Sequence, residues 1–197
     1  MKIKETYNSF TDEGYNAHFI VMDENGAYKD IDDITKLAVH FPRIVIMGDE
    51  ALKEKEDIAK LVKKCTKLKP NIIFEIYTDG TEQPVKVTNY KNIRYNVMLK
   101  MKSSKIAYDE RIIPKVISWF SEASTRFIFD IKKDDDLDEA NMIIRDNPIR
   151  KHQIFLRFVG HPTEEELKKI IQQAIDNGYN FLINWKEIFW PEVGKHE

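Results

Sequence analysis

The sequence predicts an α/β fold with a mainly parallel sheet that is either open or curled into a partial barrel. Short apolar runs rich in Ile, Val and Phe recur along the chain. Longer charged segments with helical spacing separate them, which is the pattern of strands buried beneath crossover helices. No linker, repeat or low-complexity segment interrupts the 197 residues, so residues 1–197 are expected to form a single domain.

About six or seven strands are expected, each a short run enriched in β-branched and aromatic residues. They span residues 18–23, 43–47, 71–77, 93–99, 125–131, 153–159 and 180–183. Helices are expected over residues 30–40, 51–69, 110–123, 137–146 and 163–177. Because strands and helices alternate, right-handed crossovers and parallel neighbouring strands are favoured.

Two helix starts carry recognisable signals. Thr163 and Glu166 have the spacing of a capping box, in which each side chain satisfies a backbone amide at the other position. Gly178 follows this helix where a left-handed backbone is favoured. The acidic run at 134–136 lacks the glycine that a calcium loop needs at its sixth position. We therefore interpret that run as a solvated helix start.

Composition and charge argue against several classes of protein. Lys and Arg number 31 against 33 Asp and Glu, and the basic residues are scattered, so no generic nucleic-acid binding is expected. No apolar run approaches the roughly 20 residues that span a bilayer, and the first residues lack a signal peptide's apolar stretch. A cytoplasmic protein without membrane attachment is expected. Neither a glycine-rich phosphate loop nor a zinc-hydrolase histidine spacing is present.

Four segments carry altered forms of motifs that occur together in one enzyme family. Residues 9–14 read Ser-Phe-Thr-Asp-Glu-Gly, similar to a substrate-contacting turn that ends Gln-Gly-Glu-Gly. Residues 43–52 resemble a strand leading into Gly-Gly-Glu-Pro, and residues 74–81 one ending Glu-Thr-Asn-Gly-Thr. Residues 97–100 keep only the lysine of a strand ending Ser-Pro-Lys. In this order the segments resemble 7-carboxy-7-deazaguanine synthase, a radical-SAM enzyme, from about Ser9 to Trp190.

The resemblance implies a radical-SAM-like partial (β/α) barrel and a residual pocket for a small polar heterocycle. The implied pocket residues, placed together at one mouth of the barrel, are Glu13, Gly14, Gly48, Thr78, Asp79, Thr81 and Lys100. Asp79-Gly80 is equally a common turn pair, and Lys100 could be a solvated lysine. Asp23 and Glu24 stand where the family uses magnesium, but two carboxylates alone make a weak site, so no metal is expected.

The chain lacks the sulfur ligands that the family's chemistry requires. Three cysteine thiolates on a loop after the first parallel strand hold a radical-SAM cluster. Here residues 18–24 run directly into Asn25-Gly26, as if that loop had been excised. Cys65, the one cysteine, falls on the apolar stripe of a helix, where a thiol behaves as a small core residue. Radical chemistry is therefore excluded, and no cofactor is expected. Asp49, where a glycine should approach S-adenosylmethionine, argues against retained cofactor binding.

Two functional hypotheses from different classes follow. The first is a catalytically inactive relative of the synthase, retained as a binding or regulatory protein with a protein partner. Trp185, Phe189 and Trp190 would form the partner surface, with core packing of the last strand as the alternative. The compact Lys- and Ile-rich chain would suit a virus or mobile element.

The second hypothesis is a small-molecule binder or non-radical enzyme. It would use Glu13, Asp79 and Lys100 around a purine- or pterin-like ligand. A third interpretation treats the resemblance as accidental and the chain as an unrelated α/β domain. A doubly wound open sheet, with helices on both faces, would favour that interpretation.

Overall fold

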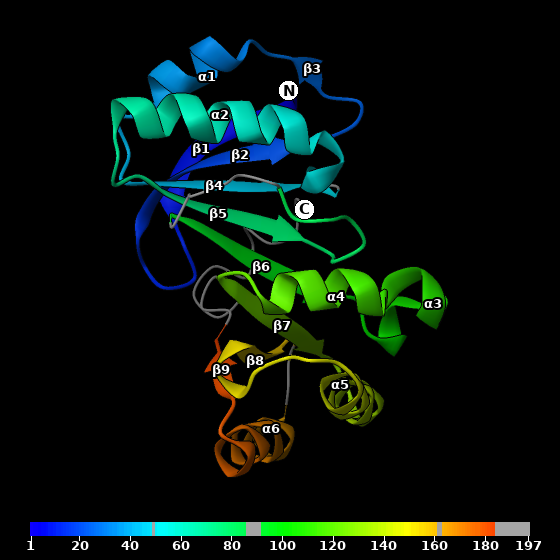
Figure 1. Cartoon of the computed structure of the whole chain (residues 1–197). Coiled ribbons are helices and arrows are strands. Elements are labelled where there is room, and N and C mark those ends of the chain that lie inside the picture. Colours follow the sequence, from blue (N-terminus) through cyan, green and yellow to red (C-terminus); the bar gives the residue numbers. More distant parts are fainter. Residues whose placement is uncertain (49, 86–91, 161–162, 184–197) are drawn as a thin grey trace.

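The computed structural model describes residues 1–48, 50–85, 92–160 and 163–183. Within these ranges the strands form one nine-stranded sheet in the order β3-β1-β2-β4-β5-β6-β7-β8-β9. The strands are β1 (Lys2–Phe10), β2 (Asn16–Met22), β3 (Ala27–Tyr28), β4 (Arg43–Gly48), β5 (Ile73–Thr78), β6 (Ile93–Leu99), β7 (Thr125–Ile131), β8 (Ile154–Phe158) and β9 (Asn180–Leu182). The sheet curls but does not close, as Figure 1 shows.

Seven of these strands, β2 and β4 to β9, run parallel to their neighbours and are the seven that the sequence predicts. The predicted α/β fold with a mainly parallel sheet is therefore confirmed. Two further strands were not predicted: β1 pairs antiparallel with β2, and the short β3 pairs with β1. Because Ile3 is the one buried residue of β1, that strand lacks the apolar alternation that reveals a strand.

The helices follow the predicted segments, with two corrections. They are α1 (Ile31–Ala38), α2 (Lys55–Leu68), α3 (Tyr108–Arg111), α4 (Pro114–Ser121), α5 (Asp134–Asp146) and α6 (Glu164–Asn177), with short 3₁₀ turns at Ala51–Glu54, Lys102–Ser104 and Lys151–Gln153. The single helix predicted over 110–123 is two helices, because Pro114 disfavours a helical residue before it and begins α4. No helix in the described ranges is long and apolar enough to cross a bilayer.

The second correction concerns the acidic run, where α5 begins at Asp134 rather than Leu137. The start is not fully solvated, because the Asp136 side chain is completely buried. Its two carboxylate oxygens accept from the backbone amides of Ser103 (3.0 Å) and Lys132 (3.1 Å). Asp136 therefore anchors α5 to the loop after β6. By contrast, the predicted capping box at Thr163 and the left-handed Gly178 are both confirmed.

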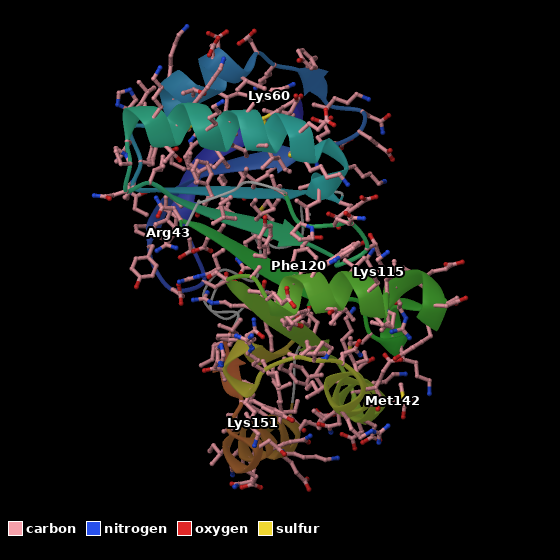
Figure 2. All side chains as sticks on the ribbon, viewed as in Figure 1. Arg43, Lys60, Lys115, Phe120, Met142 and Lys151 are labelled. Carbon is pink, nitrogen blue, oxygen red and sulfur yellow. The ribbon has the colours of Figure 1, made fainter. Side chains whose placement is uncertain are left out.

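One face of the sheet, the outer face, carries the main core. Apolar residues from the helices and from alternate strand positions form a continuous cluster there, with Phe74, Phe120, Phe127 and Phe129 its largest fully buried rings. Figure 1 shows the helices along this outer side, and Figure 2 shows Phe120 where α4 meets the sheet. Among the described residues, the opposite inner face has a small apolar cluster around Phe19 and Val45. A one-sided helix layer is not a doubly wound fold, which removes the third interpretation.

Candidate functional site

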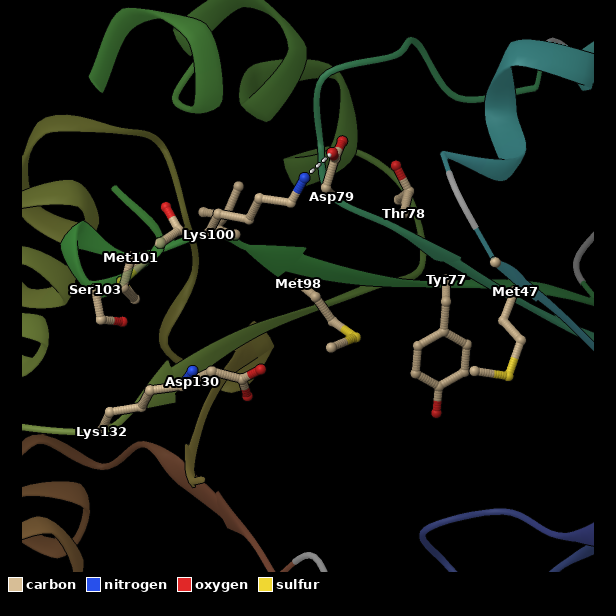
Figure 3. A pocket seen from close by; sticks show the side chains of 13 residues that line it. Met47, Tyr77, Thr78, Asp79, Met98, Lys100, Met101, Ser103, Asp130 and Lys132 are labelled. Carbon is tan, nitrogen blue, oxygen red and sulfur yellow. Dashed lines mark hydrogen bonds and ion pairs between the residues drawn. The ribbon is translucent and has the colours of Figure 1, made fainter. Parts of the chain in front are cut away.

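A cavity opens at the carboxyl ends of β4 to β7, and we call it the mouth cavity. Parallel strands bring their carboxyl ends to one edge of a sheet, where α/β folds place their sites. The cavity has a volume of about 360 Å³. Figure 3 shows Met47, Tyr77 and Met98 projecting into it from three neighbouring strands. Its wall is therefore largely apolar and rich in sulfur, and polar groups stand around it.

Several residues of the predicted pocket meet at this cavity. The residues that line it are Gly48, Thr78, Asp79 and Lys100 of the predicted set, with Leu99, Met101, Ser103, Ser104, Asp130 and Lys132. The Lys100 ammonium lies 3.0 Å from the Asp79 carboxylate. Thr81 is not part of the lining, but its hydroxyl donates to Asp79 over 2.6 Å. Asp79 is thus held by Lys100 and Thr81 in a fixed orientation beside the cavity.

Glu50, which falls within the motif at residues 43–52, was not predicted as a pocket residue; it contacts Asp79 but does not line the mouth cavity. Its carboxylate accepts from the Thr78 hydroxyl (2.8 Å) and from the backbone amides of Asp79 (2.9 Å) and Leu52 (3.0 Å). Burial, together with a hydrogen bond to the Asp79 carboxyl, raises the pKa of Glu50 to about 7. The sequence did contain a signal for this pair. Glu50 comes shortly after one buried strand and Asp79 directly after the next, and neighbouring parallel strands end at the same edge of a sheet.

Asp79 behaves in the opposite way to Glu50. Burial alone would raise the pKa of Asp79, but hydrogen bonds from Glu50, Thr81 and Lys100 outweigh it and hold that pKa below its ordinary value. Below about pH 7 the pair therefore carries one proton, and the opposite pKa shifts place it on Glu50. The Glu50 carboxyl therefore helps to hold Asp79, which lines the cavity, although Glu50 itself does not line it.

Gly48 is required because the backbone of the neighbouring strand leaves no room for a side chain, and not because a ligand must come close to it. Its backbone φ is +126°, and a Cβ placed there would lie 1.9 Å from the Met22 carbonyl oxygen. Gly48 is the register partner of Met22 in the β2–β4 pair. The glycine therefore permits two parallel strands to end in close contact, while its backbone lines the mouth cavity.

Glu13 and Gly14 do not lie at the mouth, which corrects their predicted placement. Both belong to the turn between β1 and β2, and β1 is antiparallel to β2. That turn therefore falls at the sheet edge where β2 begins, opposite the carboxyl ends. Glu13 forms ion pairs with Arg94 at 3.2 Å and with Arg126. Gly14 has a φ of +79° and completes the turn.

The inner face between these two edges carries buried charge that sequence analysis did not find. Arg43 pairs with Glu75, whose other carboxylate oxygen accepts from Asn96 over 3.3 Å. Arg157 pairs with Asp130 through two contacts of 2.7 and 2.9 Å. The sequence shows each of these residues as a single charge within an apolar strand. It does not show which charges form ion pairs, because the two partners of each pair lie on different strands.

The position of the family's cluster loop holds a tight turn. Only residues 23–26 separate β2 from β3, and the Asp23 carboxylate accepts from the Asn25 amide over 2.7 Å. A Cβ at Gly26 would lie 2.7 Å from the backbone of Ile3, so the turn packs closely on β1. No sulfur ligand is present there.

The lone cysteine and the acidic residues of this turn were the candidate metal ligands. Cys65 is buried in α2 on the outer face, and burial raises the pKa of its thiol to about 11. No group of three metal-ligating side chains gathers within the described ranges, where Asp23 and Glu24 lie. The residues present therefore do not fit an iron-sulfur cluster. Likewise, the Glu50 carboxylate is occupied by the chain's own donors rather than open to a cofactor amino group.

The fold and the mouth cavity together define a radical-SAM-like α/β partial barrel. Its solved neighbours agree. QueE from Escherichia coli, a 7-carboxy-7-deazaguanine synthase, superposes with a TM-score of 0.69 over 93% of each chain at 12% identity. SuiB from Streptococcus suis, solved with S-adenosylmethionine, gives a TM-score of 0.56 at 18% identity, over 83% of this chain and 45% of SuiB. No family model and no curated protein sequence matches the chain. At these identities the likeness shows the fold alone.

Some predicted positions lie outside the described residues. They are Asp49 and the aromatic residues Trp185, Phe189 and Trp190. The predicted partner surface at the end of the chain therefore stays a prediction.

Proposed function

We propose that this chain keeps the radical-SAM fold without the radical chemistry and binds a small, flat, polar heterocycle in the mouth cavity. The carrying observation is the cavity itself, about 360 Å³ in volume at the carboxyl edge of the sheet. Pockets of this size in that position accommodate small molecules. Of the two sequence-based hypotheses, this one draws the more direct support, because its Asp79 and Lys100 meet at the cavity.

The chemistry of the lining favours a planar ligand such as a purine or pterin. Met47, Met98 and Tyr77 offer polarizable sulfur and an aromatic ring, which contact flat π-systems well. Ring nitrogens and exocyclic groups need both donors and acceptors. The Lys100 ammonium and the Asp79 carboxylate supply them along one edge of the cavity.

The absence of radical chemistry from this proposal follows from the number of cysteines that could hold an iron-sulfur cluster. One cysteine among 197 residues cannot supply three thiolates, and Cys65 lies within α2 on the outer face. We therefore assign no catalytic residue. A catalytically inactive binding protein, cytoplasmic and compact enough for a virus or mobile element, is the proposal as a whole.

Thermal-shift screening tests the ligand part of this proposal. Deazapurines, pterins and nucleotides would each be added to the intact chain at equal concentration. A ligand at 100 times its Kd stabilises by about 2.7 kcal/mol, which corresponds to roughly 5–10 °C for a chain of this size. Lys100→Ala should reduce that shift. Lys102→Ala is the matched control, because Lys102 pairs with Asp135 and does not line the cavity. Silence from all three classes would contradict the proposal.

A regulatory role with a protein partner is the second candidate function, and one observation favours it. Strand β1 pairs with β3 only through Lys2 and Ile3, so residues 4–10 hydrogen-bond as a strand to β2 alone within the described chain. Such an edge can accept a strand from another protein. Phe10, 53% exposed, stands at its end. A partner that uses this edge should bind less well to Phe10→Asp, while Phe10→Leu should retain binding.

A further inference from the structure

The inner face of the sheet carries a row of arginines, one from each of four strands. Their chain neighbours Ile44, Tyr95, Phe127 and Leu156 belong to the outer core, so alternation directs the arginines to the inner face. The four arginines are Arg43 on β4, Arg94 on β6, Arg126 on β7 and Arg157 on β8. Figure 2 shows Arg43 at the edge where β4 starts.

The turn between β1 and β2, residues 11–15, contacts all four arginines, and we call it the hairpin tip. Glu13 bridges Arg94 at 3.2 Å and Arg126. Asp12 lies 3.8 Å from Arg157. The Tyr15 ring stacks on the Arg43 guanidinium, with 4.3 Å to the ring centroid. Three side chains of one short turn therefore satisfy a row of cations that spans five strands.

The charge count on this face depends on the hairpin tip. Strands β4 to β8 direct four arginines and two acids, Glu75 and Asp130, toward the inner face. The strands alone therefore have a surplus of two positive charges. Asp12 and Glu13 neutralise that surplus. Arg126 depends most on the tip, because its other described contact is the Phe155 ring at 5.2 Å.

The backbone of the tip forms a compact turn. Its backbone closes on itself through the Tyr15 carbonyl, which accepts from the Thr11 amide (2.9 Å), and the Thr11 carbonyl, which accepts from the Gly14 amide (2.8 Å). The Glu13–Arg94 pair that holds it is about one-third exposed on both sides, so water and salt compete with it. If the tip leaves, a mostly buried Arg126 needs another anion, because an unpaired buried cation is costly.

We propose that the arginine row is an anion site and that a phosphate-bearing ligand replaces the hairpin tip on it. Such a ligand supplies the two negative charges that Asp12 and Glu13 remove on leaving. Guanidinium groups from neighbouring strands, such as those of Arg94 and Arg126, match phosphate oxygens with paired hydrogen bonds. Arg94 and Arg126 lie near the amino edge of the sheet, whereas Arg157 pairs with Asp130, which lines the mouth cavity. The site therefore adjoins the cavity but uses different side chains from the heterocycle site proposed there.

Titration with inorganic pyrophosphate, followed by calorimetry at fixed ionic strength, tests this proposal. The double variant Asp12→Asn/Glu13→Gln removes the internal competitor and should bind pyrophosphate roughly tenfold more tightly than the unaltered chain. Asp109→Asn/Glu110→Gln is the matched control, since it neutralises an adjacent, exposed acidic pair on α3. Adding Arg126→Gln to the tip variant should abolish the gain. Equal affinity of the tip variant and the control would overturn the proposal.

A second measurement needs no variant and holds if a variant fails to fold. In the unaltered chain, saturating pyrophosphate should shift the backbone amide resonances of Gly14 and Tyr15, because the tip leaves the arginines. The amide of Lys100, at the opposite edge of the sheet, should not shift. Unchanged Gly14 and Tyr15 resonances at saturation would likewise overturn the proposal.

Discussion

The two faces of the sheet are built from different interactions. The outer face is a continuous apolar core in which Phe74, Phe127 and Phe129 lie fully buried under the helices. The inner face is held by ion pairs such as Arg43–Glu75 and Arg157–Asp130. Apolar burial is non-directional and supplies most of the folding free energy, whereas ion pairs must be matched in geometry. The outer face therefore stabilises the barrel through apolar burial, whereas the inner face depends on matched ion pairs.

The largest expected effect lies on the outer face. Phe127→Ala should lower the free energy of unfolding by about 3–5 kcal/mol, because it removes a fully buried ring and leaves a cavity. Urea unfolding monitored by circular dichroism measures this. Phe10→Ala is the control: with Phe10 53% exposed, the change should stay within about 0.5 kcal/mol. A loss below about 1 kcal/mol for Phe127→Ala would mean that the outer core is not the main source of stability.

A smaller effect is expected on the inner face. Glu75→Gln removes the charge partner of Arg43, and the Glu75 side chain is only 2% exposed. The free energy of unfolding should fall by about 2–3 kcal/mol, since breaking one side of a buried pair leaves an uncompensated charge. Asp33→Asn, which breaks an exposed pair with Lys36, should change it by less than about 0.5 kcal/mol. Equal effects in both variants would show that water reaches the inner pair.

The smallest effect depends on pH and concerns the mouth. The folded chain raises the pKa of Glu50 to about 7, above its ordinary value of 4.5. The stabilising contribution of this carboxyl is therefore complete below about pH 4.5 and is lost as the pH rises through 7. Glu50→Gln keeps a neutral group there, so the variant should gain stability relative to the unaltered chain between pH 5 and 8.

The expected gain at pH 8 is about 1 kcal/mol or more, since one unit of pKa shift corresponds to about 1.36 kcal/mol. Urea unfolding at four pH values measures it. Glu56→Gln, on an exposed position of α2, should show no such pH-dependent gain. A difference between Glu50→Gln and the unaltered chain that is constant across this pH range would contradict the shared proton at Glu50 and Asp79.

The parallel strands were predictable because both of their ends are marked by composition. The range 93–99 was predicted for β6 and 125–131 for β7, and the structure has the same bounds. Strand β1 was not predictable in this way, because an edge strand with one buried residue carries no apolar pattern. The start of α4 was predictable from Pro114, because a proline favours the first position of a helix over its interior.

The candidate site was predictable only in part. Asp79 and Lys100 come directly after neighbouring parallel strands, so their meeting at one edge follows from topology. Glu13 was misplaced because the resemblance put it at the mouth, while the antiparallel β1–β2 pair carries it to the opposite edge. The arginine row escaped sequence analysis because its four members are separated by dozens of residues and meet only when the strands align.

The sequence by itself determined the strand and helix pattern, the one-cysteine limit on cluster chemistry and the burial of Cys65, because each depends on local spacing or composition. Only the tertiary structure decided which charges meet. The Glu50–Asp79 pair, the Arg43–Glu75 pair and the hairpin tip on the arginine row all join residues that are far apart in the sequence. Coulomb interactions act through space rather than along the chain, so their partners become known only when the sheet has curled.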